Sequence, residues 1–268
     1  MLLTGGVDAT FNGQSSVIQY SNTILNSSQQ PVITFSLRLR TRDFNATILY
    51  LWHTVSNWFL SIQLADGKLQ IVHQFGASLW WNTDAFVADG IWHEVTVTYS
   101  HNRTSLIVDS SSVGDQPVVE NSLRNFVDSS CTVIIGTDAE HSSSFKGCLD
   151  EVRINSLLLP FFTRAELVND TSTDRFDVVQ MTDVEVGCHS DDVCASTAVC
   201  LNNGTCRDVW NAHMCDCAAG FNGTLCEVNI DECAAGNECD NGAMCVDGIA
   251  SYSCICAAGF TGLRYELS

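Results

Sequence analysis

The cysteines are distributed very unevenly along the 268-residue chain. Only Cys131 and Cys148 precede residue 188, whereas twelve of the 14 cysteines lie in the last 81 residues. Modules of about 40 residues bury too little apolar surface to offset the entropy of ordering the chain, so they need covalent cross-links. Because disulfides persist in oxidising compartments, this distribution predicts one large domain followed by small cross-linked modules, acting outside the cell or in the secretory lumen.

Other features of the sequence agree with an extracellular location, as a secreted protein or part of a membrane protein's ectodomain. Residues 1–6 lack the basic start and apolar stretch of a signal peptide. The longest apolar run, Leu157–Phe162, is far shorter than the roughly 20 residues of a membrane helix. We therefore expect an internal piece of a longer protein that does not itself insert into the membrane. Six Asn-x-Ser/Thr sequons are candidates for N-glycosylation: Asn26, Asn45, Asn102, Asn169, Asn203 and Asn222.

The charge and motif content exclude several classes of function. The net charge is −19, from 31 acidic and 12 basic residues. Nucleic acids and heparin-like sulfates are bound by clustered Lys and Arg, and the sequence contains no such cluster, so we expect no nucleic-acid partner. The seven histidines form no His-x-x-x-His pair, and neither a Gly-x-Ser-x-Gly motif nor a phosphate-binding glycine loop is present. We expect a protein that is not an enzyme.

Residues 7–160 show the pattern of short strands separated by polar turns. In Val32–Leu39, apolar and polar residues alternate, as in a strand with one face on a core. The strand-like stretches Phe59–Leu64 and Lys68–Val72 flank Asp66-Gly67, a pair that readily adopts the positive φ values of a tight hairpin turn. Many strands without intervening helices predict an all-β, antiparallel sandwich.

This region resembles a laminin G-like (LamG) domain along nearly its full length. The matching segments are Phe35–Thr41, Leu64–Gly67, Asp89–Val95, Leu106–Asp109 and Phe145–Ile154. The resemblance implies a jelly-roll of two curved sheets whose rim loops bind proteins or glycans, and a disulfide between Cys131 and Cys148. Some family members hold calcium on the rim, but here the uncharged Asn57 stands where their first acidic ligand falls, so we expect an ordinary polar loop residue there.

Three aromatic residues stand outside a clean strand pattern: Trp80, Trp81 and Phe86. Two interpretations remain open for them. They pack in the core of the sandwich, or they form an exposed aromatic anchor for a partner.

The next six cysteines follow the spacing of an EGF-like module, and Gly220–Cys226 matches its closing turn. Six cysteines allow fifteen connectivities, and the resemblance selects three pairs: Cys194–Cys206, Cys200–Cys215 and Cys217–Cys226. Asp208 stands where a calcium ligand belongs. However, Val193 replaces the acidic residue before the first cysteine and His213 replaces the aromatic, so we expect no calcium in this module.

Residues 229–262 resemble a calcium-binding EGF-like module. Asn229–Cys233 matches the pattern [DN]-x-[DN]-[EQ]-C, and Cys245–Cys256 matches C-x-[DN]-x(4)-[FY]-x-C-x-C. Calcium takes six to eight oxygen ligands, which a short loop supplies only when cross-links bring its halves together. The resemblance implies the pairs Cys233–Cys245 and Cys239–Cys254. It places Ca2+ on the side chains of Asn229, Glu232 and Asp247 and on the carbonyls of Ile230, Gly248 and Ser251.

Two cysteines are left over in this scheme. The family's closing turn ends in a sixth cysteine, whereas here it leads into Tyr265, which leaves Cys256 without its usual partner. Cys188, before the first module, is the other. A bond between them would join opposite ends of two modules, so we expect two unpaired thiols, or pairing with residues outside this piece.

These observations predict a laminin G-like domain at 7–160, an acidic connector at 161–187, an EGF-like module at 188–227 and a calcium-binding one at 228–268. The order resembles pieces of Fat-like and flamingo-type cadherins and of crumbs-like proteins. We expect an extracellular adhesion or recognition segment whose LamG domain binds extracellular proteins or glycans. Only six residues separate Cys226 from Cys233, so calcium would hold the joint. A structural spacer and a lectin-like glycan binder are the alternatives.

Overall fold

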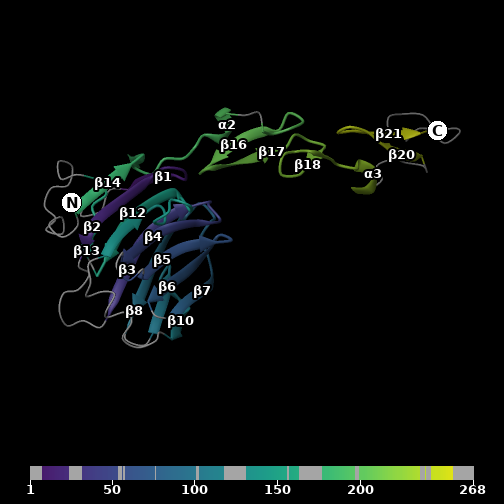
Figure 1. Ribbon diagram of the computed structural model, residues 1–268. Helices are drawn as coiled ribbons and strands as arrows, with labels where there is room; N and C mark the ends of the chain where they lie inside the picture. The colour runs from purple at the N-terminus through teal and green to yellow at the C-terminus, as the bar shows by residue number, and fades with distance from the viewer. Residues whose placement is uncertain are drawn as a thin grey trace, which may run out of the picture. The chain divides into compact units, whose positions relative to one another are not determined.

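The computed structural model describes most of the chain, and the structural statements below concern the described residues alone. These are residues 8–23, 32–53, 56, 58–75, 77–100, 103–117, 131–155, 157–162, 177–196, 199–235, 239 and 243–255. The chain divides into two compact units, residues 1–189 and 190–268. The first consists mainly of β-strands, whereas the second has short hairpins joined by turns and irregular segments (Figure 1).

The first unit is a sandwich of two antiparallel sheets (Figure 1). The eight-stranded sheet contains, in spatial order, β10 (Ser111–Pro117), β9 (Arg103–Val108), β8 (Trp92–Tyr99), β3 (Ile33–Thr41), β12 (Lys146–Ile154), β1 (Ala9–Asn12) and β15 (Val184–Val186), with β13 (Leu157–Leu158) paired to β12. The seven-stranded sheet contains β14 (Asp177–Thr182), β2 (Val17–Thr23), β11 (Cys131–Ile135), β4 (Ala46–His53), β5 (Trp58–Ala65), β6 (Lys68–Phe75) and β7 (Ala77–Phe86).

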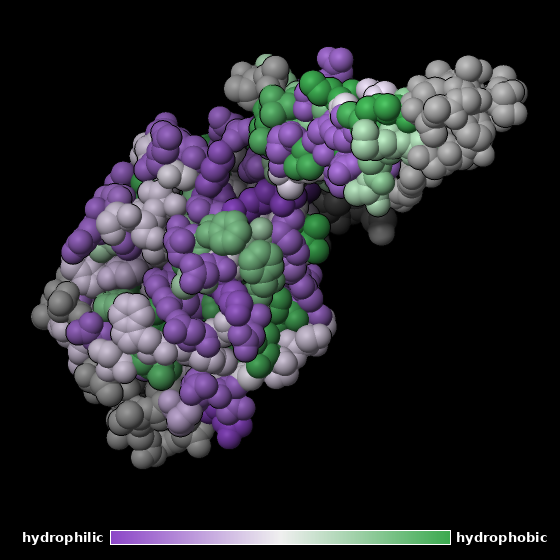
Figure 2. Space-filling model, turned by 90° about the vertical axis from the view of Figure 1, so that its right-hand side faces the viewer, coloured by the Kyte–Doolittle hydropathy of each residue, from purple (hydrophilic) through white to green (hydrophobic). Residues whose placement is uncertain are grey.

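The core lies between the two sheets, because alternate residues of each strand face inward. In β3 the burial alternates strictly along Ile33–Thr41, which confirms the pattern predicted from the sequence. Leu39 and Val97 of one sheet and Leu51 and Ile62 of the other are all completely buried in one hydrophobic cluster. The predicted antiparallel jelly-roll sandwich is therefore confirmed. The face shown in Figure 2 carries mainly hydrophilic residues with hydrophobic ones between them.

The sequence predicted that the acidic stretch before the cysteine-rich region is a connector leading out of the sandwich. In the structure, part of this stretch belongs to the sandwich. Asp177–Thr182 pairs with β2 and Val184–Val186 pairs with β1, so each sheet gains a strand from this stretch. Its valines favour strand structure, a signal that the acidic residues obscured. Residues 163–176 of this stretch lie outside the described residues.

The disulfide predicted between Cys131 and Cys148 is wrong, and so is the expectation that Cys188 is unpaired. Cys148 bonds to Cys188, with a Cα–Cα distance of 5.4 Å. Cys131 points into the core from the seven-stranded sheet, where burial raises the pKa of its thiol to about 12. Cys148 lies next to the core residue Leu149 in β12, so it faces the opposite side of the other sheet. Cys256 lies outside the described residues.

A buried histidine joins two turns at one end of β8. The Nδ1 atom of His93 lies 2.7 Å from Oδ2 of Asp109, and its Nε2 lies 3.1 Å from Oδ1 of Asp89. Burial alone would lower the pKa of His93, but the hydrogen bonds to two carboxylates outweigh it and raise that pKa. Burial acts against ionisation of both carboxyls as well, yet their bonds to backbone N–H groups and to His93 lower their pKa values.

These shifts predict a pH dependence of stability. A histidine whose pKa is raised by folding stabilises the native state fully below its unfolded pKa of about 6.5, and this stabilisation is lost as the pH rises through the folded pKa. The two aspartates contribute stability above their unfolded pKa of about 3.9 and lose it as the pH falls. We expect the free energy of unfolding to fall more steeply between pH 6 and 8 in the wild type than in His93→Gln. The exposed His141→Gln serves as the control, and equal pH profiles for all three proteins in urea unfolding would contradict this role of His93.

Candidate functional site

The second unit consists of two small cross-linked modules. Its hairpins are β16 (Thr205–Val209) with β17 (Ala212–Asp216), β18 (Phe221–Asn222) with β19 (Val228–Asn229), and β20 (Met244–Asp247) with β21 (Tyr252–Ile255). Its short helices are α2 (Val193–Ser196) and α3 (Glu232–Ala235). The disulfides are Cys194–Cys206, Cys200–Cys215, Cys217–Cys226, Cys233–Cys245 and Cys239–Cys254. These are the five pairs that the EGF-like resemblance implies.

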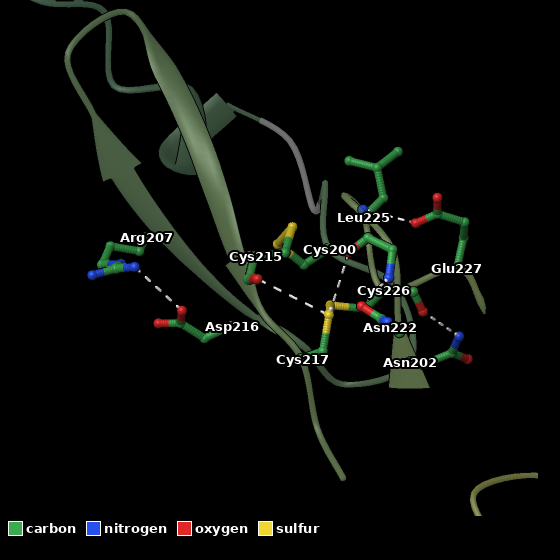
Figure 3. Close-up of a disulfide and its surroundings, with 11 residues drawn as sticks. Cys200, Asn202, Arg207, Cys215, Asp216, Cys217, Asn222, Leu225, Cys226 and Glu227 are labelled. Atoms are coloured by element: carbon green, nitrogen blue, oxygen red, sulfur yellow. Dashed lines mark hydrogen bonds and ion pairs between the residues drawn. A yellow bond between two sulfur atoms is a disulfide. The ribbon is translucent and has the colours of Figure 1, made fainter. Parts of the chain in front are cut away.

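The end of the first module is tightly held. Cys226 is completely buried, and its carbonyl accepts a hydrogen bond of 2.8 Å from Nδ2 of Asn202 (Figure 3). The side chain of Glu227 turns back and accepts the backbone N–H of Leu225 at 2.8 Å (Figure 3). Two residues after Glu227 the chain reaches Asn229, so the predicted calcium site begins on a fixed segment.

Strand β19 links the two modules. Asn229 pairs with Phe221 of the first module, and the N–H of Ile230 donates to the carbonyl of Gly220 at 2.9 Å. Gly220 has a φ of +87°, and a Cβ atom there would lie 2.4 Å from Cα of Ala250 in the second module. The backbone of one module therefore touches the other at Gly220, directly beside Asn229.

Oxygen atoms of several predicted calcium ligands converge on the side chain of Asn229. Its Nδ2 lies 2.8 Å from the carbonyl oxygen of Gly248. The same nitrogen lies 3.2 Å from Oδ2 of Asp247 and 3.2 Å from the carbonyl oxygen of Ile230. The two N–H groups of the amide carry partial positive charge. They therefore occupy the position from which a cation would contact the same oxygens.

Glu232 adds a second carboxylate to this cluster. Its backbone N–H donates to Oδ1 of Asp247 at 3.1 Å, and its buried Oε2 atom has no hydrogen-bond partner in the structure. Burial, followed by the contact with Asp247 and the repulsion from it and from Asp231, raises the pKa of Glu232. A bound cation would offset the repulsion between these two carboxylates and would give the Oε2 atom of Glu232 a partner.

The remaining predicted ligand, Ser251, has a different role. Its carbonyl accepts the N–H of Gly248 at 2.8 Å and so closes the turn between β20 and β21. No group of three or more His, Cys, Asp or Glu side chains gathers as a metal site in the described part of the chain. The cluster at Asn229 instead combines an amide, backbone carbonyls and two carboxylates, which suits the preference of calcium for oxygen ligands.

The first module repeats this framework without the ligand set. The backbone N–H of Val193 donates to Oδ1 of Asp208 at 3.1 Å, as that of Glu232 does to Asp247 in the second module. Val193 supplies no carboxylate, however. The expectation that the first module holds no calcium stays a prediction.

The structure separates the two adjacent tryptophans of the sandwich. Trp81 is 8% exposed and belongs to the core cluster, whereas Trp80 is 63% exposed. Trp80 lies on the outer face of β7, at the edge of the seven-stranded sheet, and its cross-strand partner is the buried Val72. Phe86 is 45% exposed. The core interpretation therefore holds for Trp81. Trp80 is exposed, as the other interpretation requires, and its role as an anchor for a partner stays a prediction.

A row of uncharged polar side chains runs towards the strand that bears Trp80. The hydroxyl of Ser61 donates to Oε1 of Gln63 at 3.1 Å. Nε2 of Gln63 then donates to Oε1 of Gln70, and Nε2 of Gln70 donates to Oδ1 of Asn82. We call Trp80, Gln63, Gln70 and Asn82 the Trp80 face. Sequence reasoning offered Trp80 as a possible exposed anchor but missed the row of amides, although these polar residues alternate with core residues along β5 and β6.

Three of the predicted glycosylation sites can be placed. Asn45, Asn203 and Asn222 are all exposed, whereas Asn26, Asn102 and Asn169 lie outside the described residues, as does Asn57. Within the described segments, every helix is too short or too polar to cross a bilayer.

Comparison with known proteins identifies both parts of the chain. The laminin G domain family matches residues 39–157, and the EGF-like domain family matches residues 194–225 and 233–264. Protein crumbs homolog 1 of Mus musculus is 30% identical over 235 residues, which cover 84% of this chain and 16% of that protein. Protein crumbs homolog 2 of Homo sapiens is 41% identical over 209 residues, covering 76% and 14%.

More distant relatives share the same parts. The protocadherin-like wing polarity protein stan of Drosophila melanogaster is 22% identical over 232 residues, covering 73% of this chain and 6% of that protein. Among solved structures, domains LG4-5 of the mouse laminin alpha1 chain align with a TM-score of 0.53 at 18% identity, over 67% of this chain and 46% of that chain. This likeness concerns the fold alone. The chain spans less than one fifth of the length of these crumbs relatives.

Proposed function

Because the chain consists of a laminin G domain followed by two EGF-like domains, we propose that it is an adhesion or recognition segment whose EGF-like joint is fixed by calcium and whose laminin G domain binds a partner. The domains are extracellular, as in the crumbs relatives, and six disulfides agree with that compartment. The role is one of binding and positioning.

The convergence of oxygens on Nδ2 of Asn229 carries the calcium part of the proposal. Ile230, Asp247 and Gly248 supply three of the oxygens that would hold the ion. Glu232 supplies a carboxylate beside them, and Asn229 can present its own oxygen by turning about χ2. Bound calcium would supply positive charge that offsets the repulsion between the two carboxylates.

The position of Asn229 explains why this site acts on the joint. β19 pairs with the closing turn of the first module, while Asp247 and Gly248 belong to the hairpin end of the second. Ligands from both segments are therefore held to one point when the cation is bound. Without it, the joint relies on the β18–β19 pair, on the hydrogen bond of 2.7 Å that the N–H of Ala250 donates to Oδ1 of Asn229, and on the close approach of Gly220 to Ala250.

The two modules offer a matched pair of variants for the test. Calorimetric titration of the full chain with calcium is expected to show one site in the wild type and in Asp208→Ala, which alters the first module. Asp247→Ala is expected to weaken binding at least tenfold, because loss of outer-shell partners alone costs roughly 10–100-fold in metal affinity. No binding heat from the wild type at millimolar calcium, or equal affinity in all three proteins, would rule out this site.

The Trp80 face is the surface that we assign to partner binding. A tryptophan that is 63% exposed offers a large apolar contact area, and Trp is enriched among residues that dominate binding energy. The neighbouring amides of Gln63 and Asn82 are uncharged, and Asn82 is exposed, whereas Gln70 is buried and hydrogen-bonds to both of them. A protein partner with a neutral contact surface fits this chemistry. A glycan partner and a spacer without a partner are the other outcomes of the binding test.

A further inference from the structure

A pair of phenylalanine rings lies exposed on the laminin G domain. Phe44, in the bend before β4, is 53% exposed, and Phe86, at the end of β7, is 45% exposed. Their ring centroids are 6.2 Å apart with the planes at 62°. Two rings exposed in contact present more contiguous apolar area than the single apolar residues that any surface carries.

The Asp66-Gly67 turn holds both rings in place. The N–H of Gly67 donates to the carbonyl of Phe44 at 2.8 Å, and the carbonyl of Gly67 accepts the N–H of Val87 at 2.9 Å. Gly67 has a φ of +75°, and a Cβ atom there would lie 2.5 Å from the ring of Phe86. The aromatic pair is therefore packed against a fixed turn.

The residue after Phe44 is a glycosylation acceptor. Asn45 is exposed and begins the sequon Asn45-Ala46-Thr47. Its Oδ1 accepts the backbone N–H of Asp66 at 3.2 Å. An N-linked sugar is attached to Nδ2 and leaves Oδ1 able to accept, so this hydrogen bond and a glycan are compatible. The bond fixes the plane of the amide with Nδ2 on the side away from the N–H of Asp66.

We propose that Asn45 carries an N-linked glycan whose first sugars lie on Phe44 and Phe86. When this glycan is attached, Nδ2 of Asn45 bonds to the anomeric carbon of N-acetylglucosamine from a lipid-linked oligosaccharide diphosphate. The lipid diphosphate leaves, and the amide loses one proton. Thr47 is 3% exposed in the folded domain, so the transfer precedes the folding of β4.

The chemistry of the two surfaces is complementary. A pyranose ring presents weakly polar C–H groups on its faces, and the face of an aromatic ring carries partial negative charge that attracts them. The sugar hydroxyls stay in water around the rim, where Asp66 is exposed and Lys68 forms an ion pair with Asp84. The glycan thus covers apolar area that would otherwise face solvent. This inference does not depend on calcium or on the Trp80 face.

The test uses the full chain secreted from animal cells with 13C-labelled sugars. Peptide mass spectrometry is expected to find Asn45 occupied. Proton resonances of the first N-acetylglucosamine on Asn45 are expected to lie upfield of those in the released oligosaccharide, because of the ring currents of Phe44 and Phe86. Phe44→Ser keeps the sequon and is expected to remove most of this shift. An unoccupied Asn45, or resonances equal to those of the released oligosaccharide, would overturn the proposal.

A second measurement covers the case in which Phe44→Ser is poorly folded. Asn45→Gln keeps an amide oxygen for Asp66 but has no glycan, so it is expected to bind more of a hydrophobic dye than the wild type does. The increase should disappear in the double variant Asn45→Gln, Phe86→Ser. Equal dye binding by the wild type and Asn45→Gln would show that the glycan does not cover these rings.

Discussion

Replacing Cys188 with serine is expected to lower the free energy of unfolding of the laminin G domain by about 4 kcal/mol, the loop-entropy value for a separation of 40 residues. The bond to Cys148 holds the end of the domain on β1. There the hydroxyl of Thr10 donates to the carbonyl of Gly187 at 2.6 Å and accepts the N–H of His189 at 2.9 Å. Urea unfolding of the full chain measures the loss, and proteolysis is expected to cut near residue 188.

Cys131→Ala is the control for this prediction. It leaves the Cys148–Cys188 bond intact and removes one buried atom, which costs about 1 kcal/mol. If the bond joined Cys131 to Cys148, Cys131→Ala would cause the larger loss of stability and Cys188→Ser the smaller one. Peptide mapping without reduction gives an independent answer, because a fragment linking Cys131 to Cys148 would contradict the structure.

Trp81→Ala is expected to destabilise the sandwich by about 3–5 kcal/mol, because it opens a cavity in the core. Trp80→Ala changes the neighbouring residue but is expected to alter stability by no more than about 0.5 kcal/mol. The two variants therefore test the division of this segment into a core residue and a surface residue. Equal losses in chemical unfolding would contradict it.

The same two variants distinguish a loss of partner binding from a loss of folding stability. We expect the wild type to bind at least one protein in a screen of extracellular proteins, and Trp80→Ala to bind it about 30-fold more weakly, as for a residue that contributes roughly 2 kcal/mol. Binding of arrayed glycans instead would favour the lectin-like alternative. A wild type that binds neither proteins nor glycans would favour the spacer.

Local patterns in the sequence predicted much of the fold. The alternation in Ile33–Thr41 and the Asp66-Gly67 turn appear as expected, with φ values of 52° and 75° in the turn. These features depend on neighbouring residues, which a sequence displays directly. The five disulfides of the EGF-like modules are the pairs that the resemblance to the EGF-like family implies, whereas the cysteine spacing alone leaves the connectivity open.

Contacts between distant segments were predicted less well. The Cys148–Cys188 bond and the pairing of Val184–Val186 with β1 both depend on which strand lies at a sheet edge. Neither the composition of residues 161–187 nor the spacing of their apolar residues tells which strand lies at a sheet edge. The two adjacent tryptophans show the same limit on a smaller scale, because alternation predicts that they face opposite sides but not which of them is buried.

The candidate calcium site was predicted more fully than the Trp80 face. Asn229, Asp247 and Gly248 stand at spacings that a known pattern specifies, and the structure brings them together at the joint. The row from Ser61 to Asn82 needs the register of three strands, which the sequence alone does not define. Only the turn at Asp66-Gly67 hinted at part of that register.

We propose that calcium fixes the joint between the two EGF-like domains. Residual dipolar couplings of the full chain, measured by NMR for residues 199–229 and 243–255, test it directly. With calcium, the couplings of both ranges are expected to fit a single alignment tensor. After chelation, or in Asp247→Ala with calcium, they are expected to need two. Couplings that fit one tensor equally well with and without calcium would contradict the claim.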